Sequence, residues 1–238
     1  MPSRIDRTAA PTIIFSHENA GNMGLRLTEF QLVHERTGCN ILFYDYRGFG
    51  SSDKTLPINE QGLMLDARAA WEYVMAREDV DKSNVVLYGR SLGGAVSIQL
   101  ARRLCEEKAP ILPAGLIVGN TFTSIQALVG KIYPFLNLQI VKRYLLRLEW
   151  KSVEHIRHVT VPILMIVGLQ DEIVPASHTP ELKMAAINSP RVEVHTVADG
   201  THNDTWSKAG PLYIKWLQDF LISVVQSTDD KCTDKKMD

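Results

Sequence analysis

The strongest fold signal in the sequence is the stretch Val85-Val86-Leu87-Tyr88-Gly89-Arg90-Ser91-Leu92-Gly93-Gly94. Val85–Tyr88 is an apolar run that predicts a buried strand, and Ser91–Glu107 has the apolar spacing of a helix. Gly89 and Gly93 lie two residues before and two residues after Ser91, the spacing of a nucleophile elbow. The turn is so sharp that Ser91 must adopt a strained backbone conformation and only small residues fit at the two glycine positions. The alternative interpretation is a glycine-rich turn with an idle serine.

Short apolar runs and helical patterns alternate along the rest of the chain. The predicted strands are Thr12–Ser16, Asn40–Tyr44, Val85–Tyr88, Leu116–Val118, Ile163–Val167 and Val192–Val197. The predicted helices are Leu25–Arg36, Leu63–Arg77, Ser91–Glu107, Glu181–Ile187 and Pro211–Val225. Near-continuous apolar runs are typical of strands buried on both faces. The sequence therefore predicts an α/β fold with a mostly parallel sheet and helices on both faces, in one domain over residues 1–225.

Two segments depart from this alternation. Thr121–Val161 separates two predicted strands by more residues than an ordinary connection, so we expect a helical cap insertion there. Gln226–Asp238 is polar and charged without periodicity, which predicts a disordered tail.

Composition excludes several classes of protein. The chain has 238 residues and a formal net charge of −1, so nothing favours nucleic acid as a partner. Its 3 cysteines form no close pair, which favours a reducing compartment. The first ten residues have no apolar run typical of a secretory signal, and no run of apolar residues is long enough for a membrane span. From the sequence alone we expect a cytoplasmic protein.

A serine hydroxyl becomes a nucleophile only when a base removes its proton and a third group orients that base. In parallel sheets such partners lie just beyond the carboxyl ends of later strands. Asp171 follows the predicted strand Ile163–Val167, and His202 lies in the loop after Val192–Val197. The order Ser91, Asp171, His202 is the order that a nucleophile elbow requires. We therefore predict these three residues to be catalytic.

Several other side chains compete for these roles. Asp199 and Asp204 flank the predicted histidine and are either turn residues or alternative orienters of it. His195 lies inside a predicted strand, where a packed or edge histidine is the simpler interpretation. His155 and His158 have helical spacing without a third ligand nearby, so no metal site is predicted.

Five motifs occur in order along the chain: His17–Asn22, Tyr44–Gly50, Gly89–Gly94, Asn120–Ser124 and His202–Trp206. Together they resemble the motifs of the bud-emergence-type serine hydrolases, which belong to the α/β-hydrolase superfamily beside the abhydrolase-domain proteins. The resemblance extends from about Thr12 to Phe220. It implies an α/β-hydrolase fold and neither a metal nor an organic cofactor.

The resemblance also implies roles for individual residues. Ser91 is similar to the nucleophile of the family, Asp171 to its acid and His202 to its base. The backbone N–H groups of Leu92 and Asn19 would form the oxyanion hole.

The chain departs from the family pattern in two places. Glu18 stands where the family usually has Gly. We expect its charge to oppose the developing oxyanion, so that Glu18→Gly raises kcat, unless the side chain turns outward into solvent. The family also begins with a hydrophobic anchor and a pair of antiparallel strands, whereas eleven residues precede Thr12 here. Either the sequence is truncated or the sheet lacks an edge, and the protein is membrane-associated if an anchor is missing.

These features predict a serine hydrolase that cleaves a carboxylic ester or thioester of an acyl lipid, an acylated protein or a small molecule, through an acyl-enzyme. The alternatives are a serine peptidase of oligopeptidase type and a non-catalytic ligand-binding protein on the same fold. The cap insertion combines an excess of Lys and Arg with aromatic residues. This combination is suited to peripheral contact with an anionic membrane. The alternative is an ordinary amphipathic cap with solvated charges and an apolar face in the core. The sequence does not indicate an oligomeric state.

Overall fold

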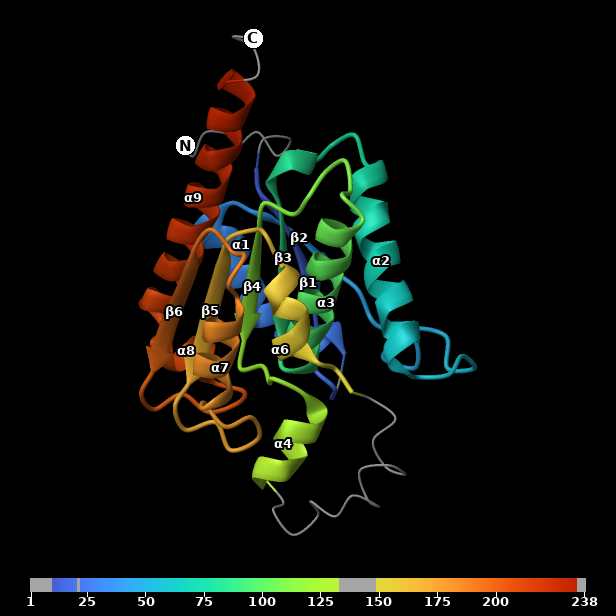
Figure 1. The fold of residues 1–238 in the computed structure, drawn as a ribbon, viewed down its shortest axis with the longest axis vertical. Helices are drawn as coiled ribbons and strands as arrows, with labels where there is room; N and C mark the ends of the chain where they lie inside the picture. Colours follow the sequence, from blue (N-terminus) through green and yellow to red (C-terminus); the bar gives the residue numbers. More distant parts are fainter. Residues whose placement is uncertain (1–9, 21, 133–148, 235–238) are drawn as a thin grey trace.

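The computed structural model describes residues 10–20, 22–132 and 149–234, which form a six-stranded sheet in the order β2-β1-β3-β4-β5-β6 (Figure 1). Every neighbouring pair of strands is parallel. The strands are β1 (Thr12–Ser16), β2 (Asn40–Phe43), β3 (Val85–Arg90), β4 (Gly115–Gly119), β5 (Ile163–Gly168) and β6 (Val192–Val197). The predicted parallel sheet is confirmed, and the described residues contain no antiparallel pair of strands.

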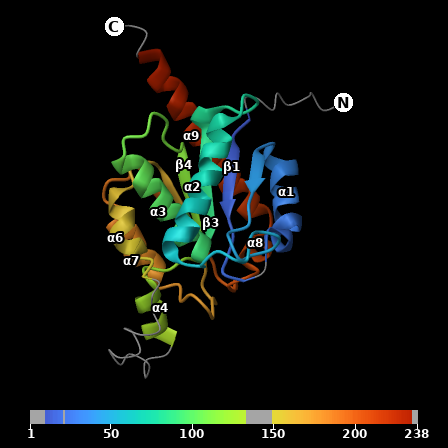
Figure 2. The ribbon, with the colours of Figure 1, turned by 90° about the vertical axis from the view of Figure 1, so that its right-hand side faces the viewer.

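Helices cover both faces of this sheet (Figure 2). On one face lie α1 (Leu27–Thr37), α8 (Thr205–Ala209) and α9 (Pro211–Asp234), with the short 3-10 helix η1 (Met23–Arg26) leading into α1. On the other face lie α2 (Glu60–Ala76), α3 (Leu92–Glu106), α6 (Ser152–His155), η4 (Ile156–His158) and α7 (His178–Ala185). The other helices of the described residues are η2 (Lys82–Asn84) before β3 and α4 (Ile125–Ile132) after β4.

The alternation of side chains along each strand creates two separate cores. In β1, Ile14 packs toward α2 and α3, whereas Ile13 and Phe15 pack toward α1 and α9. The same alternation in β3 sends Leu87 to the first core and Val86 to the second. Since both faces are buried, these strands are apolar at nearly every position, which is why they were visible in the sequence.

The strand order reverses direction at β1. The connection from β1 leads outward to β2, and the chain then crosses back to β3 on the other side of β1. Loops that leave such a reversal diverge and create a crevice beyond the carboxyl ends of the strands. The loop after β1 and the Ser91 turn after β3 both leave the sheet at this reversal.

The described parts of the predicted cap contain the helices α4, α6 and η4. α4 projects beyond the carboxyl ends of the strands (Figure 1), and α6 and η4 return the chain to the sheet. Trp150 is only 1% exposed and belongs to the core, so it is not one of the side chains that a membrane would contact. Much of the predicted basic and aromatic surface lies outside the described residues, namely Tyr133, Phe135, Leu136, Lys142, Arg143, Tyr144 and Arg147.

The sequence predicts a disordered tail over Gln226–Asp238, whereas α9 continues through Asp234. The loss of apolar periodicity after Val225 does not mark the end of this helix. A helix that is already formed gains one hydrogen bond for each residue that it adds, so polar residues can extend it. Residues 235–238 lie outside the described part of the chain.

Candidate active site

The predicted nucleophile elbow is present between β3 and α3. Ser91 has φ 54° and ψ −119°, a strained conformation for a residue with a side chain. A Cβ atom on Gly89 would lie 1.9 Å from the carbonyl oxygen of Gly93, and a Cβ on Gly93 would lie 1.9 Å from that of Ser16. Both glycines are therefore required by contacts with backbone that cannot move aside. The second contact also packs the start of α3 against the end of β1.

His202 and Asp171 are brought together from the loops after β6 and β5. The Nδ1 atom of His202 lies 2.8 Å from Oδ2 of Asp171, and both residues are buried. The other oxygen of Asp171 accepts the backbone N–H groups of Ile173 at 2.9 Å and Val174 at 2.7 Å. Because a carboxylate only accepts, the proton of this hydrogen bond is on Nδ1 of His202. Nε2 is therefore the ring nitrogen that is left for the role of general base.

The competing aspartates have other partners. Asp204 accepts the backbone N–H of Thr201 at 2.7 Å and its hydroxyl at 2.8 Å, and these hydrogen bonds lower the pKa of Asp204. Asp199 pairs with Lys208 at 3.4 Å. They are turn and surface residues, which leaves Asp171 as the partner of the histidine.

The other histidines do not form a metal site. His195 stacks on Trp216, with ring centroids 4.4 Å apart and planes 2° from parallel. His158 pairs with Glu106 at 3.3 Å. In the part of the chain that the structure describes, no group of three or more His, Cys, Asp or Glu residues is placed to hold a metal ion.

Two residues after β4 support the site and were not predicted as functional. The Asn120 side chain donates to the carbonyl of Thr201 and the hydroxyl of Thr205, both at 3.1 Å, and accepts the N–H of Gly168 at 3.2 Å. The Thr121 hydroxyl donates to the carbonyl of Ser91 at 2.7 Å. Together they fix the histidine loop and the elbow to the end of β4. Their only signal in the sequence was their place in one of the five motifs.

Ser91 and His202 are not joined by a hydrogen bond within the described residues, so their pairing stays a prediction. Such contacts are often long in free enzymes and shorten when substrate binds. Ser91 lies at the first turn of α3, where the unpaired backbone N–H groups and the positive end of the helix dipole favour negative charge.

The loop after β1 carries the second predicted oxyanion donor, Asn19. The His17 side chain donates through Nδ1 to the carbonyl of Glu18 at 2.7 Å. Because the peptide is trans, fixing the Glu18 carbonyl also fixes the Asn19 N–H in the opposite direction. Burial lowers the pKa of His17, which keeps its ring neutral. Leu92 and Asn19 remain predicted oxyanion donors.

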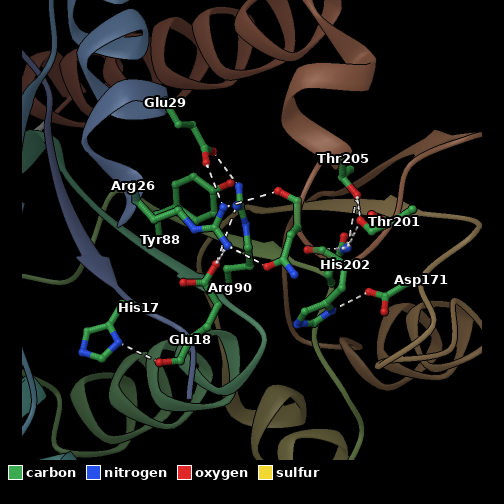
Figure 3. A network of polar contacts seen from close by, with 12 residues as sticks. His17, Glu18, Arg26, Glu29, Tyr88, Arg90, Asp171, Thr201, His202 and Thr205 are labelled. Atoms are coloured by element: carbon green, nitrogen blue, oxygen red, sulfur yellow. Dashed lines mark hydrogen bonds and ion pairs between the residues drawn. The ribbon is translucent and has the colours of Figure 1, made fainter. Parts of the chain in front are cut away.

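Glu18 follows neither course expected from the sequence. Its side chain does not turn into solvent, because the residue is 8% exposed. Its charge is not free either, because Oε1 lies 2.6 Å from Nη2 of Arg26 (Figure 3). The alternative of a side chain that turns into solvent is therefore wrong, and the effect of the paired Glu18 charge on the oxyanion stays a prediction.

Comparison with known proteins places this geometry in context. The model of a hydrolase family described as "Serine aminopeptidase, S33" matches residues 21–153. The chain is 37% identical over 221 residues to the alpha/beta hydrolase domain-containing protein WAV2 of Arabidopsis thaliana, covering 89% of this chain and 70% of that protein. It is 34% identical over 212 residues to the protein bem46 of Schizosaccharomyces pombe, covering 89% of this chain and 67% of that protein.

Solved structures show the same fold at lower sequence identity. The esterase Pf2001 of Pyrococcus furiosus superposes with a TM-score of 0.69 at 17% identity, covering 92% of this chain and 85% of the esterase. At this identity the similarity concerns the fold.

Proposed function

Because this chain belongs to the α/β-hydrolase family, we propose that it is a serine hydrolase that cleaves carboxylic esters or thioesters through an acyl-enzyme. The observation that carries the proposal is the buried hydrogen bond of 2.8 Å between His202 and Asp171, at the same end of the sheet as the strained Ser91 elbow. A neutral histidine oriented by a carboxylate is what a serine needs to become a nucleophile.

The proposed reaction proceeds in two stages. Nε2 of His202 accepts the proton of Ser91 while Oγ attacks the carbonyl carbon of the substrate. The Leu92 and Asn19 N–H groups stabilise the oxyanion, an effect worth about 2.7–4 kcal/mol per donor. The tetrahedral intermediate then collapses, and His202 passes its proton to the leaving alkoxide or thiolate. In the second stage, a water molecule deprotonated by His202 releases the acid from Ser91.

Labelling with a fluorophosphonate tests the proposal, because this probe reacts covalently only with an activated serine. We expect the wild-type protein to be labelled and Ser91→Ala to be unlabelled with an unchanged Tm. His202→Ala should lose about as much ester hydrolysis as Ser91→Ala, since members of a triad act as a unit. Absence of labelling in the wild-type protein would favour a non-catalytic ligand-binding protein instead.

A serine peptidase is the second candidate, and the description of the matching family model favours keeping it. Hydrolysis of aryl esters, acyl thioesters and aminoacyl anilides, measured with the same protein preparation, separates the two reactions. We expect kcat/KM for the esters and thioesters to exceed that for the anilides. The reverse order would identify a peptidase.

Contact with a membrane is a separate proposal about the cap insertion. No helix in the described ranges has the length and apolarity of a membrane span. Lys151, one of the basic residues of the insertion, pairs with Glu149 at 2.9 Å, which reduces the free positive charge. Co-sedimentation with neutral and anionic vesicles tests the proposal, and equal binding to both would leave an ordinary amphipathic cap.

A further inference from the structure

Four charged side chains meet in a buried cluster beside the candidate site: Glu18, Arg26, Glu29 and Arg90 (Figure 3). Arg26 lies 2.6 Å from Glu18 and 4.0 Å from Glu29, whereas Arg90 lies 2.5 Å from Glu29 and 3.6 Å from Glu18. The side chains are between 1% and 12% exposed. Two positive and two negative charges therefore balance in a space from which water is nearly excluded.

The cluster is anchored to the fold on the side away from the site. The Tyr213 hydroxyl of α9 donates to Glu29 at 2.5 Å, and Tyr88 of β3 donates to the Tyr213 oxygen at 2.8 Å. Arg90 ends β3 and directly precedes Ser91. Burial is the largest single influence on the pKa of Arg90 and acts to lower it. The negative charge of Glu29, together with Tyr88, Tyr213 and Glu18, outweighs burial and raises the pKa, so Arg90 stays charged. Glu29 and Arg90 thus form a fixed base for the other two members.

Arg26 extends from this base to the loop that carries His202. Its Nη1 donates to the carbonyl of Asn203 at 3.3 Å, and its Nη2 donates to Oδ1 of the same residue at 3.0 Å. The same Nη2 lies against Glu18, the residue before the predicted oxyanion donor Asn19. One guanidinium group therefore contacts the immediate neighbours of both Asn19 and His202.

We infer that Arg26 is a positioning residue that sets the distance between the oxyanion loop and the general base, with Glu18 and Asn203 as its two attachment points. This inference rests on the proposed function. Arginine suits the role because its planar group holds several acceptors in fixed directions, which lysine does not. A buried cluster of paired charges adds little net stability, so the contribution that we assign to it is fixed geometry. Glu18 is then part of the catalytic support.

Variants of Asn203 test the inference with the least effect on folding, because this side chain is exposed and the ion pairs remain. Asn203→Ala removes the Oδ1 acceptor, whereas Asn203→Asp keeps it. We expect Asn203→Ala to slow fluorophosphonate labelling and to lower kcat for an aryl ester, each by about fivefold, with KM unchanged. Asn203→Asp should stay within about twofold of wild type at the pH plateau.

Arg26→Ala removes both attachments and should lower kcat by about tenfold or more. Glu18→Gln and Asn203→Ala should have little additional effect in the Arg26→Ala background, because their contacts act through the same group. Arg68→Ala is the matched control. Arg68 lies on α2 and also bridges two glutamates, Glu72 and Glu107, but these side chains are more exposed. We expect Arg68→Ala to leave the rates unchanged.

Hydrogen exchange separates failure of this inference from failure of the proposed function. If Arg26 holds the two loops, amides in residues 17–20 and 200–204 exchange faster in Arg26→Ala and Asn203→Ala than in the wild-type protein. This readout requires no activity, so it applies even if the wild-type protein is never labelled. Unchanged exchange and unchanged rates in Asn203→Ala would overturn the inference, whether or not Arg26→Ala folds.

Discussion

Gly93 packs against the carbonyl oxygen of Ser16, where there is no room for a Cβ atom. Its lack of a side chain therefore allows the elbow to pack against the end of β1. We predict that Gly93→Ala lowers the free energy of unfolding by about 3 kcal/mol, the upper range for overpacking a rigid site. Gly119→Ala is the control, because its Cβ would meet no atom closer than 3.7 Å. That variant should gain about 0.4–1 kcal/mol from reduced freedom of the unfolded chain. Urea denaturation measures both, and equal effects would refute the steric argument.

The sequence alone led us to expect that Glu18→Gly raises kcat. The ion pairs of Glu18 lead us to expect the opposite. Glu18→Gly leaves Arg26 and Arg90 facing one glutamate in a buried cluster, which destabilises by about 3 kcal/mol. We predict a lower Tm and a lower kcat. An increase in kcat would show that the charge opposes the oxyanion after all.

Individual candidate residues were predictable where chemistry fixes both residue type and chain order. Ser91, Asp171 and His202 met this condition, and the structure brings the last two into contact. Arg26 and Asn203 did not, because they are 177 residues apart and carry no local pattern. Pairing between distant charges depends on how the elements pack, which a single sequence does not encode locally.

Helix α2 has a cap that can be tested without disturbing the site. Asn59 has extended φ and ψ, and its side chain accepts the N–H of Gly62 at 2.8 Å. We predict that Asn59→Ala lowers the free energy of unfolding by about 1 kcal/mol and leaves ester hydrolysis unchanged. Gln61→Ala, an exposed position in the first turn, should have no measurable effect. A loss of activity in Asn59→Ala would mean that α2 contributes to the site.

Strands were predictable more accurately than helix ends. β1 has the predicted bounds, because burial on both faces makes its apolar run coincide with the strand. β6 also has the predicted bounds, although it is an edge strand that is only partly buried. α2 starts at Glu60, earlier than the predicted Leu63, since its first turn is set by the Asn59 cap and not by apolar spacing. α9 extends past its last predicted residue, Val225, because polar residues can extend a helix that is already formed.

The whole molecule is organised by a strand order that alternation alone does not specify. Alternating strands and helices predict a parallel sheet, but the reversal at β1 depends on which face each crossover helix covers. α1 lies on one face, whereas α2 and α3 lie on the other. This division places the loops after β1 and β3 side by side and creates the site.

Burial of three histidines makes the free energy of unfolding depend on pH. Burial is the main cause that lowers the pKa of His17, His155 and His195 from the ordinary value of 6.5. Below pH 6.5 the unfolded chain therefore binds protons at these residues more readily than the folded chain. Stability is complete above this pH and is lost as the pH falls toward the folded pKa values, by at most about 1.4 kcal/mol per pH unit for each histidine.

We predict that the free energy of unfolding, measured in urea, declines steadily from pH 7.5 to 5.0. Carboxylates with lowered pKa values, such as Asp204 and Glu106, lose their contribution only below their ordinary values of 3.8 and 4.5, outside this range. The double variant His155→Gln, His195→Gln leaves the candidate site intact and should flatten the decline, with His17 responsible for the remainder. A stability that rises toward pH 5.0, or a double variant with the wild-type slope, would show that these histidines do not control it.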